Sequence, residues 1–460
     1  MAVPVVADPT GDSMPGAELS AFAHQSMELL ARRDPELYRL LVADLRRQTD
    51  TLMLVAASSV ADPSVLACEG TALMNVTGEG YPGARFHAGC GVVDDIERLA
   101  VDRAKTIFGA RYANVQPHSG SSANLCALFA LLSPGDTILG LDLDSGGHLT
   151  HGSAASVTGR YFNSVAYEVD EQGLIDYDGV RAAAERHHPK VLICGASAYP
   201  RVIDFARLRE IADEIGAYLL ADISHIAGLV AAGVHPSPID HAHITTTSTY
   251  KQLYGPRGGL ILLGKDANAP SPGGKGTLEQ LMQRAVFPLA QGTPNMAAIA
   301  AKARAFAMVG TEDFRNLARL IVHDARTLAE ELAARGFRIL TGGTDTHMVL
   351  LDLQAQGMSG LVAERALEEC LIVTNKNRIP GDTRPARITS GLRLGTNTVA
   401  MRGMRAPEMR SCADLVRRVL DATDPLTDTD YALDPAVRGV VADTIRDHCR
   451  SFPLPGYPSR

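Results

Sequence analysis

The chemistry that this sequence can support centres on one lysine. Lys251 follows six consecutive hydroxyl-bearing residues, 245–250, and precedes the glycine-rich turn 255–259. The nearest lysine toward the amino terminus is Lys190, so no other ammonium group stands close to Lys251 in the sequence. An amine in a polar but uncharged run can be held close to its neutral form, which suits a Schiff-base nucleophile.

An aspartate precedes this lysine at the end of an apolar run. Asp222 follows residues 218–221, the pattern of a buried strand that ends on a polar side chain. An acid at one strand end and a lysine at the next are how a fold holds pyridoxal phosphate, because the acid keeps the ring nitrogen protonated while the amine forms the Schiff base. The two residues therefore predict this cofactor.

Two further segments suit pyridoxal phosphate, although each also has an ordinary interpretation. Ser119, Gly120 and Ser121 precede a helix and can present N–H and hydroxyl groups to a phosphate, but a plain serine N-cap gives the same pattern. His148 and His151 have the spacing of a metal-ligand pair or of structural histidines, yet no Cys or Glu stands nearby to complete a familiar metal site. We favour a third interpretation, in which the flat imidazole of His148 stacks on the cofactor ring, and we predict no metal.

A carboxylate and a guanidinium indicate an amino-acid substrate. Glu79 lies in the glycine-punctuated segment 75–83, where it is either a solvated turn residue or an acid/base beside a substrate hydroxyl. Arg393 lies between two leucines in a strand pattern, where it either pairs with a structural acid or forms a fork for a substrate α-carboxylate. Each signal is weak alone, and their combination favours the catalytic interpretation.

The elements that must position these residues follow an α/β pattern. Apolar strands alternate with amphipathic helices up to about residue 310, which predicts a large, mostly parallel sheet with helices on both faces and ligands at the carboxyl ends of the strands. We expect strands near 137–140, 191–194, 218–221, 243–246 and 259–263. Three parts are predicted: a tail and helical arm (1–50), a large cofactor-binding domain (51–310) and a smaller α+β domain (311–460).

Composition excludes several classes of protein. The net charge of −8 argues against a nucleic-acid or anionic-membrane surface, and no apolar stretch is long enough to span a bilayer. Seven scattered cysteines, with no CxxC pair, fit a reduced compartment and not a zinc site. The first 19 residues lack the features of a signal peptide and are expected to form a disordered tail. We therefore expect a cytoplasmic protein.

Taken together, the motifs resemble the serine hydroxymethyltransferase family of fold-type I pyridoxal phosphate enzymes. The resemblance runs from about residue 50 to 420 in almost colinear order. Its motifs are Gly-Glu-Gly-Tyr-Pro-Gly at 78–83, Ala-Asn-Val-Gln-Pro-His-Ser-Gly-Ser at 113–121, and the segments 146–152, 222–228, 245–259, 342–345 and 389–396.

The resemblance implies a role for each matching position. It makes Lys251 the Schiff-base lysine, Asp222 the partner of the ring nitrogen, Arg393 the carboxylate-binding residue and Glu79 an acid/base contributed across a subunit interface. The remaining implied contacts are the cofactor phosphate (Ser119, Gly120, Ser121 and, from a neighbouring subunit, Gly292), the cofactor ring and its hydroxyl (His148, Ser197, His225), and tetrahydrofolate as cosubstrate (Leu143, Gly147, Asn377). A homodimer or homotetramer with shared active sites follows.

The sequence departs from the family pattern around the substrate. Thr77 stands where the family has tyrosine, Phe86-His87 replaces a tyrosine pair, and Tyr250 replaces the histidine before the lysine. Thr77 removes a ring's worth of volume beside the substrate Cα, which would admit an α-methyl group, as in the 2-methylserine branch of the family. Neutral drift in a serine enzyme is the alternative. Thr77 and His87 are therefore candidate substrate-binding residues, and Tyr250 is a candidate catalytic residue.

The function expected from these observations is a hydroxymethyltransferase. It would interconvert serine or, preferentially, 2-methylserine with glycine or D-alanine, and tetrahydrofolate would carry the one-carbon unit. Two alternatives stay open: a folate-independent α-methylserine aldolase or threonine transaldolase, since the replaced tyrosine pair includes a residue that resembles the family's folate-stacking position, and a non-catalytic binding protein of the same fold.

Overall fold

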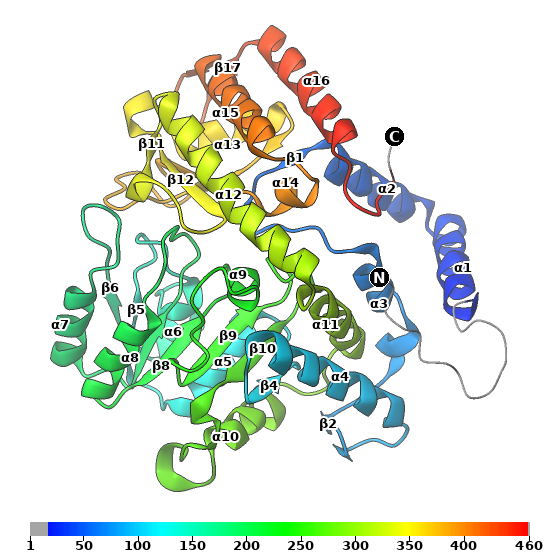
Figure 1. The fold of residues 1–460 in the computed structure, drawn as a ribbon, viewed down its shortest axis with the longest axis vertical. Coiled ribbons are helices and arrows are strands. Elements are labelled where there is room, and N and C mark those ends of the chain that lie inside the picture. Colours follow the sequence, from blue (N-terminus) through cyan, green and yellow to red (C-terminus); the bar gives the residue numbers. More distant parts are fainter. Residues whose placement is uncertain (1–16, 459–460) are drawn as a thin grey trace.

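The computed structural model describes residues 17–458, which form two packed regions with a helical arm beside them (Figure 1). The lower region in the figure surrounds a seven-stranded sheet, and the upper region contains the carboxyl-terminal elements. None of the helices within residues 17–458 combines the length and apolar character needed to span a bilayer.

The large sheet is mostly parallel, as the sequence predicts. Only β10 runs antiparallel to its neighbours, β4 and β9. The strands, in spatial order, are β4 (Tyr112–Asn114), β10 (Gly259–Leu263), β9 (Ile244–Ser248), β8 (Tyr218–Asp222), β7 (Val191–Cys194), β5 (Thr137–Leu141) and β6 (Asn163–Tyr167).

Successive side chains of these strands enter two different cores, because strand residues alternate between the faces of a sheet. In β8, Leu219 and Ala221 belong to one core, and Leu220 belongs to the core on the opposite face. The first core is covered by α4 (Gly91–Phe108), α7 (Tyr177–His187), α8 (Phe205–Glu214), α9 (Ala227–Ala231) and α11 (Met296–Val309). The second is covered by α5 (Gly120–Leu131) and α10 (Leu278–Arg284). Both faces are therefore shielded, as a parallel sheet requires.

The upper region is built on an antiparallel sheet. Its strands are, in spatial order, β11 (Arg338–Ile339), β12 (Met348–Asp352), β15 (Gly391–Gly395) and β14 (Asn375–Asn377). Its main helices are α13 (Gly360–Glu369), α15 (Ala406–Asp421) and α16 (Pro435–Ser451), with the short α14 (Asn397–Met401) after β15. The small strands β16 (Thr423–Pro425) and β17 (Tyr431–Leu433) form a hairpin. This is the α+β architecture expected for the carboxyl-terminal part.

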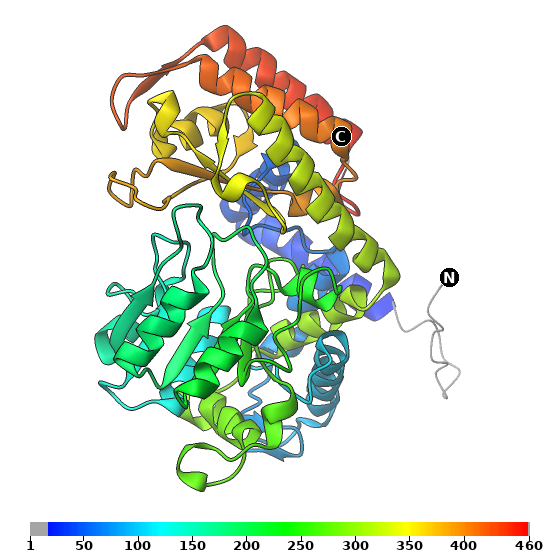
Figure 2. The same cartoon turned by 60° about the vertical axis from the view of Figure 1, so that its left-hand side comes forward.

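One helix connects the two regions. The first half of α12 (Glu312–Ala334) places Phe314 and Ile321 in the core of the large sheet, and its second half places Leu328 and Leu332 in the core of the antiparallel sheet. Figure 2 shows α12 passing from one region to the other. Its continuous backbone fixes the two sheets relative to each other.

The amino-terminal segment also reaches the upper region. Helices α1 (Ala17–Arg33) and α2 (Pro35–Asp50) have no buried residue, but β1 (Leu52–Met53) pairs in parallel with β13 (Ile372–Val373). Because α1 begins at Ala17, the expectation of a disordered tail up to residue 19 is wrong for its last three residues. Ala17, Glu18 and Leu19 favour helix, and an acidic side chain in the first turn is favourable there. The rest of that expectation lies outside the described residues.

Helix α12 also contains a buried acid without a hydrogen-bond partner. The side chain of Asp324 is fully buried, and neither carboxylate oxygen has a partner within the described residues. Burial raises the pKa of Asp324 to about 6, although the charges of Arg405 and His323 oppose the shift and that of Glu408 adds to it. Because the pKa in the folded state lies above the ordinary value, this group stabilises the fold at low pH and loses that contribution as pH rises through about 6.

We predict that Asp324→Asn raises the melting temperature at pH 8 by about 2–4 °C, the shift that about 1 kcal/mol produces in a unit of 150–250 residues. The gain is expected to shrink at pH 5, where the native carboxyl group is mostly protonated. Calorimetry at the two pH values measures the difference. A gain that is equal at both, or absent, would show that the carboxylate is neutralised by its surroundings.

Candidate active site

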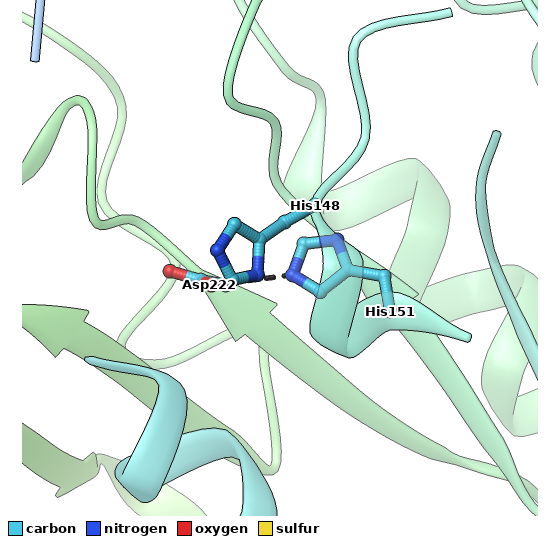
Figure 3. A group of neighbouring side chains, drawn as sticks. All are labelled: His148, His151 and Asp222. Atoms are coloured by element: carbon cyan, nitrogen blue, oxygen red, sulfur yellow. Dashed lines mark hydrogen bonds and ion pairs between the residues drawn. The ribbon is translucent and has the colours of Figure 1, made fainter. Parts of the chain in front are cut away.

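The charged centre of the candidate site is the carboxylate of Asp222 at the carboxyl end of β8. Asn124 Nδ2 donates to Asp222 Oδ2 over 2.8 Å, and His151 Nε2 lies 3.2 Å from the same oxygen. The backbone N–H of Ser224 donates to Oδ1 over 2.9 Å. Figure 3 shows the side chains of Asp222, His148 and His151 close together, with the contact between His151 and Asp222 drawn as a dashed line.

These contacts keep the buried carboxylate ionised. Burial alone would raise the pKa of Asp222, but the hydrogen bond and charge of His151, together with His148 and the Ser224 N–H, bring that pKa below its ordinary value. The ligand atoms of His148, His151 and Asp222 lie within 4.8 Å of one another, a grouping that could also hold a metal ion. The hydrogen bond between His151 and Asp222 accounts for the grouping without one.

Lys251 lies in the turn that follows β9 and is buried. Burial lowers the pKa of Lys251 to about 8; the charge of Asp222 opposes this shift, and those of Arg393 and Arg257 add to it. The ring centroid of Tyr250 lies 5.7 Å from Lys251 Nζ and 3.7 Å from Arg257 Cζ. A much larger fraction of this amine is therefore neutral near physiological pH than in an ordinary lysine, which favours a nucleophile.

Arg393 reaches this site from β15 in the upper region. Its guanidinium donates to the carbonyl of Ser197, which belongs to the large-sheet region, and to Asn375 Oδ1 over 3.0 Å. Burial lowers the pKa of Arg393 to about 10. No carboxylate of the described residues forms an ion pair with this arginine, so the structural pairing considered from the sequence is not observed within residues 17–458.

Two stacked histidines lie next to these charges. The rings of His225 and His347 are 6.2 Å apart and nearly parallel, and His347 Nε2 lies 3.1 Å from the carbonyl oxygen of Ala56. Burial, followed by the charges of Lys251 and Arg393, lowers the pKa of His225 well below its ordinary value. The Nδ1 atom of each ring is buried and has no partner within the described chain, so the site retains unused polar groups.

The predicted phosphate cradle lies at the start of α5, beside the same strand ends. Ser119 caps the helix by accepting from the Ser122 N–H over 3.0 Å. A Cβ at Gly120 would lie 3.0 Å from Ser224 Oγ and 3.1 Å from the backbone nitrogen of Ser248. The helix start therefore packs against the turn after Asp222 and the end of β9, where its N–H groups and dipole favour an anion.

Asn397 connects the lysine turn to the strand that carries Arg393. Its side-chain oxygen accepts from Gln252 Nε2 over 3.2 Å, and its backbone carbonyl accepts from the hydroxyl of Tyr254 over 3.1 Å. Its side-chain nitrogen donates to the carbonyl of Ala56 over 3.1 Å. Asn397 thus holds together elements of both regions and the amino-terminal segment.

The other predicted substrate residues form a second group on an exposed edge. His87 Nε2 lies 3.3 Å from Glu79 Oε2, and a Cβ at Gly292 would lie 3.3 Å from Glu79 Oε1. Thr77 is exposed on the same short segment as Glu79. The structure therefore brings Glu79, His87 and Gly292 together.

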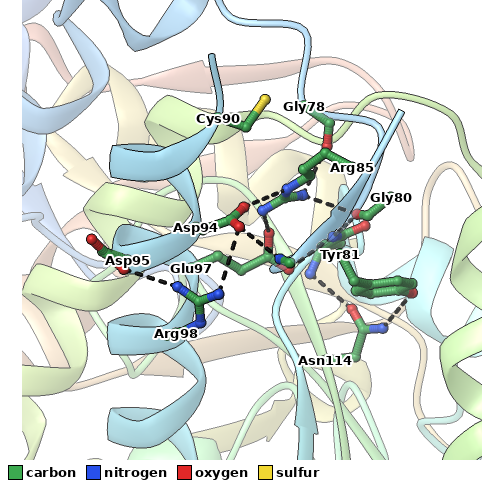
Figure 4. A network of polar contacts seen from close by, with 12 residues as sticks. Gly78, Gly80, Tyr81, Arg85, Cys90, Asp94, Asp95, Glu97, Arg98 and Asn114 are labelled. Carbon is green, nitrogen blue, oxygen red and sulfur yellow. Dashed lines mark hydrogen bonds and ion pairs between the residues drawn. The ribbon is translucent and has the colours of Figure 1, made fainter. Parts of the chain in front are cut away.

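A buried polar network holds this edge in place (Figure 4). Arg85 donates to the carbonyls of Gly78 and Gly80, on either side of Glu79, and forms ion pairs with Asp94 and Glu97 of α4. The segment therefore keeps its shape although Glu79 itself is partly exposed.

The three predicted folate-binding residues lie on two segments that an ion pair connects. Arg378 Nε lies 2.6 Å from Asp144 Oδ1. Arg378 follows Asn377 in the sequence, and Asp144 follows Leu143. A Cβ at Gly147 would lie 2.0 Å from the carbonyl oxygen of Leu141, so only glycine allows this close turn.

The buried residues around Asp222 and Lys251, here called the buried group, offer polar atoms that fit pyridoxal phosphate. The buried group offers an amine of lowered pKa at Lys251, an ionised carboxylate at Asp222, an imidazole of lowered pKa at His148 and a helix amino terminus with two serines. The unpartnered Nδ1 of His225 leaves a polar contact free for a bound group. These residues meet the needs of an aldehyde, a protonated ring nitrogen and a phosphate.

Comparison with known proteins decides the family. A family model described as serine hydroxymethyltransferase matches residues 30–416. The chain belongs to the serine hydroxymethyltransferase family. Serine hydroxymethyltransferases from Xanthomonas campestris pv. campestris strains B100 and 8004 are each 46% identical over 423 residues, which cover 92% of this chain and 97% of the relative. Serine hydroxymethyltransferases are fold-type I, pyridoxal phosphate-dependent one-carbon transferases that use tetrahydrofolate as cosubstrate.

Sequence reasoning missed several residues that support the site. The sequence suggests only a pairing of His151 with His148, whereas the structure places His151 beside Asp222, and Asn124, which donates to Asp222, is absent from the sequence-based predictions. The spacing of Asn124 from Gly120 places it one helical turn along α5, which is the signal that could have found it. His347 and Asn397 had no signal of this kind, because their partners are distant in the sequence.

We predict that the apoprotein captures pyridoxal phosphate covalently at Lys251 with a rate that rises about tenfold per pH unit below about 8 and then levels, because only the neutral amine is nucleophilic. Borohydride reduction at set times, followed by peptide mass spectrometry, measures the adduct. Lys251→Ala is expected to fold and to give no adduct. An adduct at another lysine in that variant would contradict the assignment, as would a rate that does not change with pH.

Proposed function

We propose that this protein interconverts 2-methylserine and D-alanine in preference to serine and glycine, with tetrahydrofolate carrying the one-carbon unit. The observation that carries the preference is the small side chain of Thr77 on the segment of Glu79, at a position where the family pattern has tyrosine. The assignment of the individual site residues below belongs to the same proposal.

The buried group would bind the amino acid by its two charged ends. Arg393 receives the α-carboxylate, since its guanidinium is buried without an acidic partner among the described residues. Lys251, with a pKa of about 8, exchanges protons with the substrate amine and holds the cofactor between turnovers. When bound, pyridoxal phosphate supplies an electron-accepting ring for the breaking Cα–Cβ bond. Asp222 favours the protonated ring nitrogen because the carboxylate stays ionised.

The second group of residues, at the exposed edge that carries Glu79 and His87, would act on the hydroxymethyl end of the substrate. Glu79 takes or returns the proton of the substrate hydroxyl, and His87, 3.3 Å from its carboxylate, orients that group. Thr77 leaves volume for an α-methyl group near this proton transfer. Leu143, Gly147 and Asn377 would receive the folate.

A homodimer would bring the two groups into one site. Glu79 and His87 are about one-third to one-half exposed, which is unusual for a catalytic pair that must exclude water. The arm helices α1 and α2 also expose apolar side chains, including Leu19, Phe22 and Leu40. A second copy of the chain would cover these surfaces, and a symmetric interface would let each copy complete the site of the other.

We predict that Thr77→Tyr lowers the ratio of kcat/KM for 2-methylserine over serine by about 10-fold or more, because the ring fills the volume of the α-methyl group. Both enantiomers of 2-methylserine, L-serine and L-threonine are compared. Thr77→Ser, which keeps the volume small, is the matched control and is expected to retain the native ratio. An unchanged ratio in Thr77→Tyr would remove the argument for 2-methylserine.

The same panel, run with and without tetrahydrofolate, tests the one-carbon carrier. We expect cleavage of 2-methylserine to depend on tetrahydrofolate. Full turnover without it would support the aldolase or transaldolase alternative, for which Phe86 is the relevant departure: its ring is exposed and packs edge-on against Phe287, 5.5 Å away.

A mixing experiment tests the shared site. Lys251→Ala and Glu79→Gln are each expected to be nearly inactive as pure proteins. If the two residues serve one site from different copies, half of a random mixture is heterodimer with one intact site, and activity returns to about one-quarter of the native value. Mixing Lys251→Ala with Lys251→Ala/Glu79→Gln is the control. No recovery, under conditions where labelled copies are shown to exchange, would contradict a site built from two copies.

A further inference from the structure

A second buried lysine lies beneath the cradle at the start of α5. Lys302 projects from α11, and its side chain is almost completely buried. Its Nζ donates to the carbonyls of Val115 (2.6 Å), Pro117 (3.2 Å) and Gly259 (3.1 Å). An ammonium group has three N–H donors, so these three carbonyls satisfy it fully.

No carboxylate of the described residues pairs with this ammonium group. It forms no ion pair within residues 17–458, and the charge of Glu97 only partly opposes the burial that lowers the pKa of Lys302 to about 7. A buried charge without a counter-ion is costly and is retained where an anion or a positioning role offsets the cost.

The three carbonyls that Lys302 joins belong to two segments that meet at the cradle. Val115 and Pro117 belong to the segment that leads into Ser119. Gly259 is the first residue of β10, which follows the turn that carries Lys251. The Gly259 N–H donates to the carbonyl of Pro117 over 2.8 Å, and a Cβ at Gly259 would lie 2.2 Å from the carbonyl oxygen of Ser119. Lys302 therefore lies beneath a contact that sets where residues 119–121 stand.

We propose that Lys302 is a positioning residue for phosphate binding: its ammonium group fixes the segment that ends in Ser119–Ser121 against β10 and places beneath the cradle a positive charge that no carboxylate of the described residues pairs with. This inference rests on the proposed assignment of Ser119, Gly120 and Ser121 to the cofactor phosphate. It adds a role for a residue that does not itself touch the cofactor.

The comparison of pyridoxal phosphate with pyridoxal isolates this role, because pyridoxal has the same aldehyde and ring but no phosphate. Lys302→Met keeps the length of the side chain and removes the ammonium group. We expect the Kd of the apoprotein for pyridoxal phosphate to rise about 10-fold or more, as for the loss of hydrogen bonds to a charged group, while the Kd for pyridoxal changes little. Equilibrium dialysis measures both constants.

The controls separate a phosphate effect from general damage. Lys265→Met removes a charge from an exposed lysine and is expected to leave both constants unchanged. Equal weakening of pyridoxal phosphate and pyridoxal in Lys302→Met would overturn the proposal, because it would show a structural effect on the whole site. Unchanged binding of pyridoxal phosphate would also overturn it.

A second variant keeps Lys302 in the sequence but pushes its ammonium group out of its present position. A Cβ at Gly258 would lie 2.3 Å from Lys302 Cε and 2.7 Å from Nζ, and 2.9 Å from Thr249 Oγ1. We expect Gly258→Ala to cause the same selective loss of pyridoxal phosphate binding, and the combination with Lys302→Met to add little. Additive losses, or a Gly258→Ala variant with native affinities, would contradict a shared cause.

Ser121→Glu distinguishes failure of this inference from failure of the cradle assignment. A carboxylate there is expected to exclude pyridoxal phosphate and to spare pyridoxal. If Ser121→Glu shows this selectivity and the Lys302 and Gly258 variants do not, the cradle assignment stands and the inference about Lys302 is wrong. If none of them does, both are wrong.

Discussion

A carboxylate that must stay ionised inside the protein determines much of this architecture. Removing the charge of Asp222 from water costs several kcal/mol unless hydrogen bonds replace the water. Asn124, His151 and the Ser224 N–H supply them, and they come from α5, from the turn after β5 and from the turn after β8. Thr246 of β9 in turn holds the side chain of Asn124. The start of α5, the two turns and the strands β8 and β9 therefore meet at one point, because the buried carboxylate of Asp222 requires hydrogen-bond donors.

The placement of Arg393 depends on contacts between the two regions. Helix α12 contributes to both cores, and Asn397 joins the lysine turn to the strand of Arg393. The carbonyl of Ala56 accepts from both His347 and Asn397, so the amino-terminal segment is part of the same junction. In the proposed site, the amine and carboxylate ends of the substrate would be held by elements that are far apart in the chain, so small changes in this junction would alter where the substrate Cα lies.

The sequence predicted the large sheet, its mostly parallel order and the α+β character of the carboxyl-terminal part, because buried strands and helix periodicity are local signals. It also predicted Lys251 and Asp222 as site residues, since an aspartate at the end of an apolar strand and a lysine after a hydroxyl-rich run are visible without a structure. It did not reveal that Arg85 braces the segment of Glu79, or that Lys302 lies beneath the cradle. Lys302 was visible only as a charge within an apolar, alanine-rich helix, and the carbonyls that explain it come from segments more than 40 positions away.

The pairing of β1 with β13 has a consequence for how the chain is made. Ile372 follows its partner Leu52 by 320 positions, and a ribosome adds about 5–20 residues per second. Leu52 and Leu54, which end fully buried, therefore wait about 16–64 seconds for the strand that will cover them. During that time the large sheet can already fold, whereas the junction beneath Arg393 cannot close. The segment around Leu52 thus leaves the ribosome long before its partner strand and reaches its final place late.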